Sequence, residues 1–344
     1  MQFLKRLGLL VLILLLSTLV IVGCGNGGDN SDTGKAEKQG AVAAAEPAKI
    51  DFPTKPIGYI IPFNPGGQSD VEARRQQPLL EEFLGTSIVV QYKAGGGGAL
   101  GWTELMHAEP DGYTISGINI PHIILQPIAR ENAGYSTEQI NPIAIFQGTP
   151  IGLAVLKDSP FDSLEDFIAY AKENPGKITV GGSGKWSGHH IALLQLEALA
   201  GIDLNYIPET GAAPSVSKFL GGHTDALFAN SNDLVTHNDR IKILGLGSEE
   251  RFEALPDVPT FVEQGYDMTP SIDRGAAVPP DTPDEVKAVL EEAFVKIMNN
   301  QSVREQMTEQ GFVPLNMDAE KAQQHIKKKQ QEYSKLLQDL GLPE

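Results

Sequence analysis

Cysteine and positive charge are both scarce in this sequence. The chain of 344 residues has one cysteine, Cys24, so no disulfide can form within it. It has 27 lysine and arginine residues against 44 acidic ones, and its formal net charge at pH 7 is −17. This balance argues against nucleic acid as a partner and against purely electrostatic binding to an anionic membrane. The length predicts a large core and about two domains.

Long apolar runs are also rare, and the one that stands out lies at the amino terminus. Residues 7–22 are uncharged, which is long for the apolar part of a signal peptide and short for a membrane span of about 20 residues. The run ends in Ile-Val-Gly-Cys24, which resembles a bacterial lipobox. Residues 1–23 are therefore predicted to be a lipoprotein signal peptide, with Cys24 as the lipidated first residue of the mature protein. The alternative is a signal anchor with an incidental cysteine.

The segment that follows the cysteine has no pattern that would form a core. Residues 24–51 are mostly small and polar, a composition typical of a flexible tether. We therefore expect the globular part to lie outside the cytoplasm and to be anchored to the membrane through Cys24.

The rest of the chain alternates between strand-like runs and helical patterns. Strands are predicted at 57–62, 87–92, 113–118, 142–146, 152–157, 177–182, 203–208, 225–229 and 241–247. Helices are predicted at 71–80, 163–177, 191–199, 213–220, 283–299 and 319–340, the second with Ser163 as its N-cap. This alternation predicts an α/β fold with largely parallel sheets and ligand sites at the carboxyl ends of the strands.

Two glycine-rich loops each join a predicted strand to a predicted helix. They are PFNPGGQSD (62–70) and KAGGGGALG (93–101). Glycine costs about 0.5–1 kcal/mol against alanine within a helix or strand, so the four glycines 95–98 must serve another purpose. If both loops leave one edge of a parallel sheet, their free N–H groups and helix dipoles converge and could hold an anion without any lysine. Asp70 could contact such a ligand or favour the first turn of the helix after Ser69.

Neither loop matches a known nucleotide-binding motif. A P-loop requires lysine after its last glycine, and Gln68 follows Gly67. In TVGGSGKW, Thr179 replaces the first glycine and Trp186 replaces the serine or threonine that would bind magnesium. The nucleophile elbow G-x-S-x-G also fails, because Lys185 stands in the place of its last glycine.

The segment GSGKWSGHH (182–190) can be interpreted in two ways. As part of an enzyme, it would supply Ser183 or Ser187 as a nucleophile and His190 as a base. In the simpler interpretation it is a loop that caps the helix beginning near His189. Adjacent histidines point to different sides of a helix and no carboxylate stands at ligand spacing, so we expect no metal site and no cofactor.

Seven segments of the chain, taken in order, resemble the solute receptors of tripartite tricarboxylate transporters, the Bug family. The resemblance covers essentially all of residues 52–340. It implies an α/β, two-lobed clamshell of the periplasmic-binding-protein type (type II), with two hinge crossings near residues 150 and 272. The first lobe would be 52–150 and 273–344, and the second 151–272. The segments are FPTKPIGYIIPFNPGGQSDVEAR, KAGGGGALG, PDGYT, GKITVGGSGKWSGHHIA, IPETGAAPSVSKFLGGHTDALF, LPDVPTFVEQGYD and AVPPDTPDEVKAVLEEAF.

The resemblance also implies a function. The chain would be a monomeric extracytoplasmic receptor, not an enzyme, that binds a small organic carboxylate. It would deliver this ligand to the large and small membrane subunits of a tripartite permease. Two alternatives stay open: a lipid-anchored serine hydrolase, and a carboxylate sensor that feeds a membrane kinase.

The resemblance further implies the ligand-binding residues. One carboxylate would lie between the loops 63–69 and 183–187, with backbone N–H groups from 210–214. Arg274 replaces an aromatic residue of many relatives, and Glu209-Thr210-Gly211 replaces their aromatic-Lys-Gly. Arg274 could hold a second carboxylate or brace the hinge through an ion pair with Asp273, Glu209 or another acid. The predicted set is Phe63, Asn64, Gly66, Gly67, Ser69, Asn119, His122, Ser183, Gly184, Ser187, Thr210, Gly211, Ala212 and Arg274.

Overall fold

The structure is a computed structural model, and it describes residues 50–130 and 132–342. The predicted signal peptide, Cys24 and nearly all of the predicted tether lie outside these residues. In the described part of the chain, no helix combines the length and the apolarity that crossing a membrane requires.

The first lobe is built on a mixed sheet. Its strand order is β2-β1-β3-β9-β4, with β10 also paired to β4. The three strands β1, β2 and β3 are parallel, whereas β9 is antiparallel to both β3 and β4. The strands are β1 (Ile57–Ile61), β2 (Ile88–Tyr92), β3 (Thr114–Ile120), β4 (Asn141–Leu156), β9 (Ser271–Val278) and β10 (Val313–Met317).

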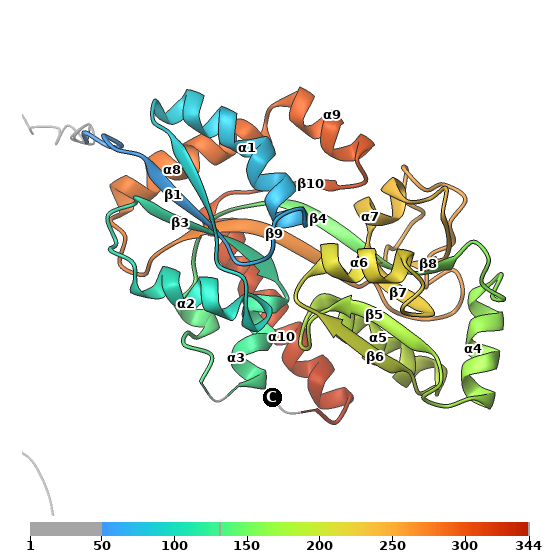
Figure 1. The fold of residues 1–344 in the computed structure, drawn as a ribbon. Coiled ribbons are helices and arrows are strands. Elements are labelled where there is room, and N and C mark those ends of the chain that lie inside the picture. Colours follow the sequence, from blue (N-terminus) through green and yellow to red (C-terminus); the bar gives the residue numbers. More distant parts are fainter. Residues whose placement is uncertain (1–49, 131, 343–344) are drawn as a thin grey trace, which may run out of the picture. The chain divides into compact units, whose positions relative to one another are not determined.

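Helices cover both faces of this sheet (Figure 1). One apolar core lies between the sheet and α1, α8 and α9, and a second lies between the sheet and α2, α3 and α10. Trp102 and Phe294 are fully buried in these two cores. The helices are α1 (Gln68–Leu84), α2 (Ala99–His107), α3 (His122–Ala129), α8 (Asp284–Met298), α9 (Gln301–Glu309) and α10 (Ala319–Asp339).

The second lobe continues from the carboxyl half of β4. Residues 151–156 of this strand pair with β7 and β8, and β7 is followed by the parallel strands β5 and β6. Its cores consist of residues between 151 and 272. Its elements are α4 (Leu164–Glu173), β5 (Thr179–Ser183), α5 (Gly188–Ala200), β6 (Asn205–Glu209), α6 (Ala212–Leu220), β7 (Ala226–Asn230), α7 (Ser231–Thr236) and β8 (Ile241–Leu246).

Local signals predicted several of these elements well. Ser163 caps α4, because its hydroxyl accepts a hydrogen bond from the N–H of Asp166 at 3.1 Å. Pro78 lies inside α1, which continues to Leu84. The strands predicted at 142–146 and 152–157 are present, but the break predicted between them is wrong, because β4 runs without interruption from Asn141 to Leu156.

Candidate functional site

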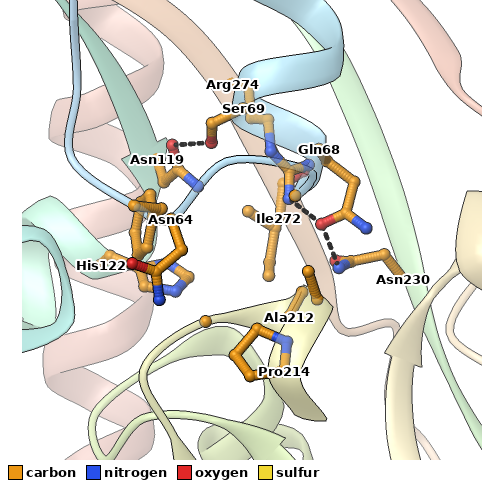
Figure 2. A pocket seen from close by; sticks show the side chains of 14 residues that line it. Asn64, Gln68, Ser69, Asn119, His122, Ala212, Pro214, Asn230, Ile272 and Arg274 are labelled. Atoms are coloured by element: carbon orange, nitrogen blue, oxygen red, sulfur yellow. Dashed lines mark hydrogen bonds between the residues drawn. The ribbon is translucent and has the colours of Figure 1, made fainter. Parts of the chain in front are cut away.

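A small cavity lies where the two lobes meet (Figure 2). Its volume is about 20 Å³, which is room for about one water molecule. Side chains of the two lobes are joined around it, for example by a hydrogen bond of 2.8 Å from Asn64 Nδ2 to Thr210 Oγ1. The lobes are therefore closed on each other around this small cavity, which is too small for an organic carboxylate in this form. The cavity is lined by Phe63, Asn64, Gly67, Gln68, Ser69, Asn119, His122, Gly211, Ala212, Ala213, Pro214, Asn230, Ile272 and Arg274.

The loop between β1 and α1 forms part of the first lobe's wall. Gly66 has φ +82°, and Gly67 follows as the N-cap of α1. The N–H of Gly66 donates to Asp70 Oδ2 at 2.8 Å. The predicted contact between this N–H and a ligand is therefore already taken by Asp70, whose side chain braces the loop. Gly67 faces the cavity.

The end of β3 and the start of α3 complete this wall with polar side chains. Ser69 Oγ donates to Asn119 Oδ1 at 3.2 Å. The His122 ring lies edge-on to Phe63, with 5.6 Å between the ring centroids. Burial lowers the pKa of His122 to about 3, with smaller contributions from His189 and Arg274. His122 is therefore uncharged at neutral pH, and its buried Nδ1 has no hydrogen-bond partner among the described residues.

Arg274, on β9, supplies the only formal positive charge among the side chains that line this cavity. Only 3% of the residue is exposed. Its Nη1 donates to Thr149 Oγ1 at 2.5 Å, and its Nη2 lies 3.5 Å from Gln68 Oε1. Burial lowers the pKa of Arg274 to about 10, which still leaves the guanidinium charged at neutral pH. Its buried Nε has no partner in the part of the chain that the structure describes.

Neither of the two acids named as possible ion-pair partners of Arg274, Asp273 and Glu209, pairs with it. Asp273 Oδ2 lies 2.7 Å from His325 Nε2 instead. The carboxylate of Glu209 pairs with Lys218 at 2.5 Å. Neighbouring residues on a strand point to opposite faces, which explains why Asp273 cannot reach the same partners as Arg274.

The second lobe presents a mainly apolar wall. Ala212 and Pro214, at the start of α6, face the polar side chains of the first lobe (Figure 2). Ile272 also lines the cavity. Asn230 is the polar side chain on this wall, and its Nδ2 donates to Gln68 Oε1 at 2.8 Å. The site is thus polar on one side and apolar on the other.

Gln68 links the two lobes, and sequence reasoning missed its role. Its Oε1 accepts from Asn230, and its Nε2 donates to Asp233 Oδ2 at 2.5 Å. Asn230 and Asp233 were missed as well. A signal existed for both, because Asn230 is the last residue of β7 and Asp233 follows three residues later, at the carboxyl end of a strand, where α/β proteins place ligand sites.

A larger cavity adjoins the first, since Phe63 and Gly211 line both. Its volume is about 320 Å³. Arg130 and Lys185 lie on its walls, as do residues of the second glycine-rich loop, 95–97. The glycines of the two loops therefore do not converge on one spot as predicted: Gly67 lines the small cavity and Gly95–Gly97 line the larger one, which only Phe63 of the first loop also lines.

The structure distributes the predicted ligand-binding residues over these two cavities. Nine of them line the small cavity: Phe63, Asn64, Gly67, Ser69, Asn119, His122, Gly211, Ala212 and Arg274. Ser183, Gly184 and Thr210 line the larger one. Gly66 and Ser187 line neither. Ser187 is fully buried, and its hydroxyl caps α5 by accepting from the N–H of His190.

The serine and histidine side chains do not form the pair that the hydrolase alternative named. His190 Nδ1 lies 3.3 Å from the N–H of Trp186, and neither Ser183 nor Ser187 contacts its ring nitrogens through a hydroxyl in the described structure. Ser183 Oγ instead lies 2.9 Å from His189 Nδ1. Burial lowers the pKa of His189 to about 3, whereas an effective general base at neutral pH has a pKa near 7. This geometry favours the loop-capping interpretation.

Comparison with known proteins agrees with this arrangement. Residues 72–342 match the model of the tripartite tricarboxylate transporter family receptor. The chain belongs to this family. It is 27% identical over 303 residues to protein BugT of Bordetella pertussis, which covers 86% of this chain and 93% of that one. It is 28% identical over 304 residues to a protein encoded in the gbd 5′ region of Cupriavidus necator, covering 87% and 92% of the two chains.

Solved structures of receptors confirm the predicted fold. The periplasmic binding protein BugD is 27% identical, with a TM-score of 0.80 and coverage of 85% of this chain and 99% of that one. A periplasmic transporter matches with a TM-score of 0.81 at 28% identity and with the same coverage. The prediction of a two-lobed α/β clamshell of the periplasmic-binding-protein type, and of a receptor of this family, is therefore confirmed.

Proposed function

We propose that this chain is an extracytoplasmic receptor that binds a small organic carboxylate between its lobes. We further propose that it delivers this ligand to the large and small membrane subunits of a tripartite permease, that it acts as a monomer, and that Cys24 anchors it to the membrane. The proposed lobes are 52–150 with 273–344, and 151–272, and the twelve predicted ligand-binding residues that line the two cavities would face the ligand, whereas Gly66 and Ser187 would not. The buried, positively charged Arg274 in the wall of the interlobe cavity carries the proposal.

A buried guanidinium needs hydrogen-bond acceptors and negative charge, and Arg274 has partners for only part of its donors. Its partners Thr149 and Gln68 are neutral, and its Nε is buried without a partner within residues 50–130 and 132–342. A carboxylate is planar and accepts hydrogen bonds from such a fork of N–H groups. A ligand carboxylate would therefore supply Arg274 with the hydrogen-bond acceptors and the negative charge that its neutral partners do not provide.

The remaining wall can orient a carboxylate without adding charge. His122 is uncharged, Asn64, Ser69 and Asn119 are neutral, and Gly67 begins α1. The N-terminus of a helix carries free N–H groups and partial positive charge, which favour an anion. Partners on both lobes would make the closed form the better binder, so the ligand would shift the population toward closure.

Calorimetry on a variant of Arg274 tests the proposal. Arg274→Lys should weaken binding of the carboxylate that is released from protein purified from its native host and identified by mass spectrometry. The expected loss is about tenfold or more, since a hydrogen bond to a charged group is worth about 1.5–3 kcal/mol and lysine cannot copy the fork.

The matched control is Arg251→Lys, because Arg251 is half-exposed, pairs with Glu263 and lines neither cavity. This control should bind like the parent. An Arg274→Lys protein that melts like the parent and binds the carboxylate with parental affinity would overturn the proposal. If Arg274→Lys melts early, Asn64→Asp provides a second test, because a negative charge on the cavity wall should also weaken binding.

A further inference from the structure

Asp233 is an acidic side chain beside the cavity that the proposed function leaves without a role. It lies in α7, three residues beyond the carboxyl end of β7. Its Oδ2 accepts a hydrogen bond from Gln68 Nε2 at 2.5 Å and lies 3.5 Å from Asn230 Nδ2. Both of these partners line the cavity. Asp233 is therefore one side chain removed from any ligand bound there.

Asp233 offsets the charge of Arg274. Among the acidic side chains it has the largest effect in raising the pKa of Arg274, ahead of Asp273 and Glu72. Gln68 touches both charged groups, since its Oε1 faces Arg274 and its Nε2 faces Asp233. The cation and the acid thus share one hydrogen-bonded network, and their formal charges sum to zero.

The other groups near Asp233 add no net positive charge to this sum. On α1, Glu72 is paired with Arg75. On β9, Asp273 is engaged by His325. On α5, His189 is uncharged at neutral pH because burial lowers its pKa to about 3. The side chains around the closed cavity therefore provide no net positive charge at neutral pH.

We propose that Asp233 selects the ligand by its charge: the site takes a monocarboxylate, and a dicarboxylate binds only with uptake of a proton by Asp233. This inference rests on the proposed function. Helix N-termini can offset part of one negative charge, but a second charge in a closed cavity would be left without compensation, which is costly. The apolar wall formed by Ala212, Pro214 and Ile272 suits the alkyl chain of a monocarboxylate.

The inference predicts a dependence on pH with a definite sign. Burial of its carboxylate raises the pKa of Asp233 to about 6, and the residue as a whole is half-buried. A bound dianion raises this pKa further, because it favours the neutral form of a nearby acid. The affinity for dicarboxylates should therefore rise as the pH falls from 8 to 6. The affinity for monocarboxylates should rise less, since they carry half the charge.

Calorimetry at pH 7.5 tests the inference. Each monocarboxylate is compared with the dicarboxylate of the same chain length, from propionate and malonate to hexanoate and adipate. The parent should bind the monocarboxylate of the best-bound pair more tightly. Asp233→Asn should shift the affinity ratio of that pair toward the dicarboxylate by at least about tenfold. The parent should take up a proton when it binds the dicarboxylate, and Asp233→Asn should take up none. Proton uptake is measured as a difference in binding enthalpy between buffers that have different enthalpies of ionisation.

The matched control is Asp239→Asn, because Asp239 is exposed and follows closely in the chain. It should leave both the affinity ratio and the proton uptake unchanged. If the parent binds both acids of a pair and Asp233→Asn leaves their ratio and the proton uptake as in the parent, charge selection by Asp233 is overturned while the receptor function stands. If the parent binds neither acid of any pair but binds the carboxylate released from protein of its native host, this inference is overturned and the receptor function stands; if it binds no carboxylate at all, both fail.

Discussion

The two glycine-rich loops look alike in the sequence but differ in what their glycines do. Each loop joins a parallel strand to a helix. A Cβ on Gly66 would meet no atom within 4 Å, and one on Gly67 would meet only Asn64 O at 3.7 Å. In the second loop, a Cβ on Gly96 would lie 2.7 Å from Arg130 Nη1, and one on Gly98 would overlap the indole of Trp102.

This difference separates two reasons for a glycine. In the first loop, the absence of side chains keeps open a surface that faces the small cavity. In the second loop, large side chains of the first lobe pack directly onto the backbone and leave no room for a Cβ. Gln126 packs on Gly97 in this way, and its Nε2 also donates to the carbonyl oxygens of Lys185 and Trp186 in the second lobe, at 3.1 Å each. Similar glycine-rich sequences therefore keep a surface open to the ligand in one loop and allow close packing in the other.

The largest effect is expected for Gly98→Ala. Gly98 has φ +102°, and the new Cβ would overlap Trp102, which is fully buried. Strain of this kind and overpacking each cost about 1–3 kcal/mol, so the free energy of unfolding should fall by about 3 kcal/mol. Chemical denaturation measures it. Gly67→Ala is the matched control and should lose about 1 kcal/mol or less, the usual scale for a poor N-cap residue. Equal losses in the free energy of unfolding for the two variants would contradict the proposed difference between the loops.

A loss of affinity rather than stability is expected for Gly67→Val. The valine side chain would project from the N-cap of α1 into the cavity and reduce carboxylate affinity by about tenfold. The free energy of unfolding should fall by about 1 kcal/mol or less, the usual scale for a poor N-cap residue. Calorimetry and denaturation on the same samples separate the two effects, with Gly67→Ala as an intermediate case. Normal binding by Gly67→Val would show that the loop is only a turn.

The smallest effect on ligand affinity is expected for Gly66→Ala. The left-handed conformation of Gly66 costs an alanine about 1–2 kcal/mol, and space is available for the Cβ. Gly66→Asn should recover part of this cost, because asparagine tolerates the conformation better. Ligand affinity should stay as in the parent, since the N–H of Gly66 is bound to Asp70. A loss of affinity as large as that of Gly67→Val would instead make Gly66 a ligand contact.

Much of the fold could be predicted from local patterns, and the main error also has a local cause. Gly148 and Pro150 read as a break between two strands because glycine and proline usually end such elements. In the structure this segment is held inside β4, where Gly148 pairs with Asp273 and Pro150 with Ser271 on β9. Pairing with a strand more than a hundred residues away outweighs the local preference.

The sequence by itself was sufficient for the family, the alternation of strands and helices, and the loops at the carboxyl ends of strands. These features depend on periodicity, caps and glycine positions within short segments. The partners of Arg274 could not be read in this way, because Gln68, Thr149 and Asp233 come from three distant segments. They meet only because β4 and β9 run side by side where the lobes join and α1 and α7 begin beside them. The tertiary structure alone decided that Asp233, rather than Asp273 or Glu209, is the acid that chiefly offsets the charge of Arg274.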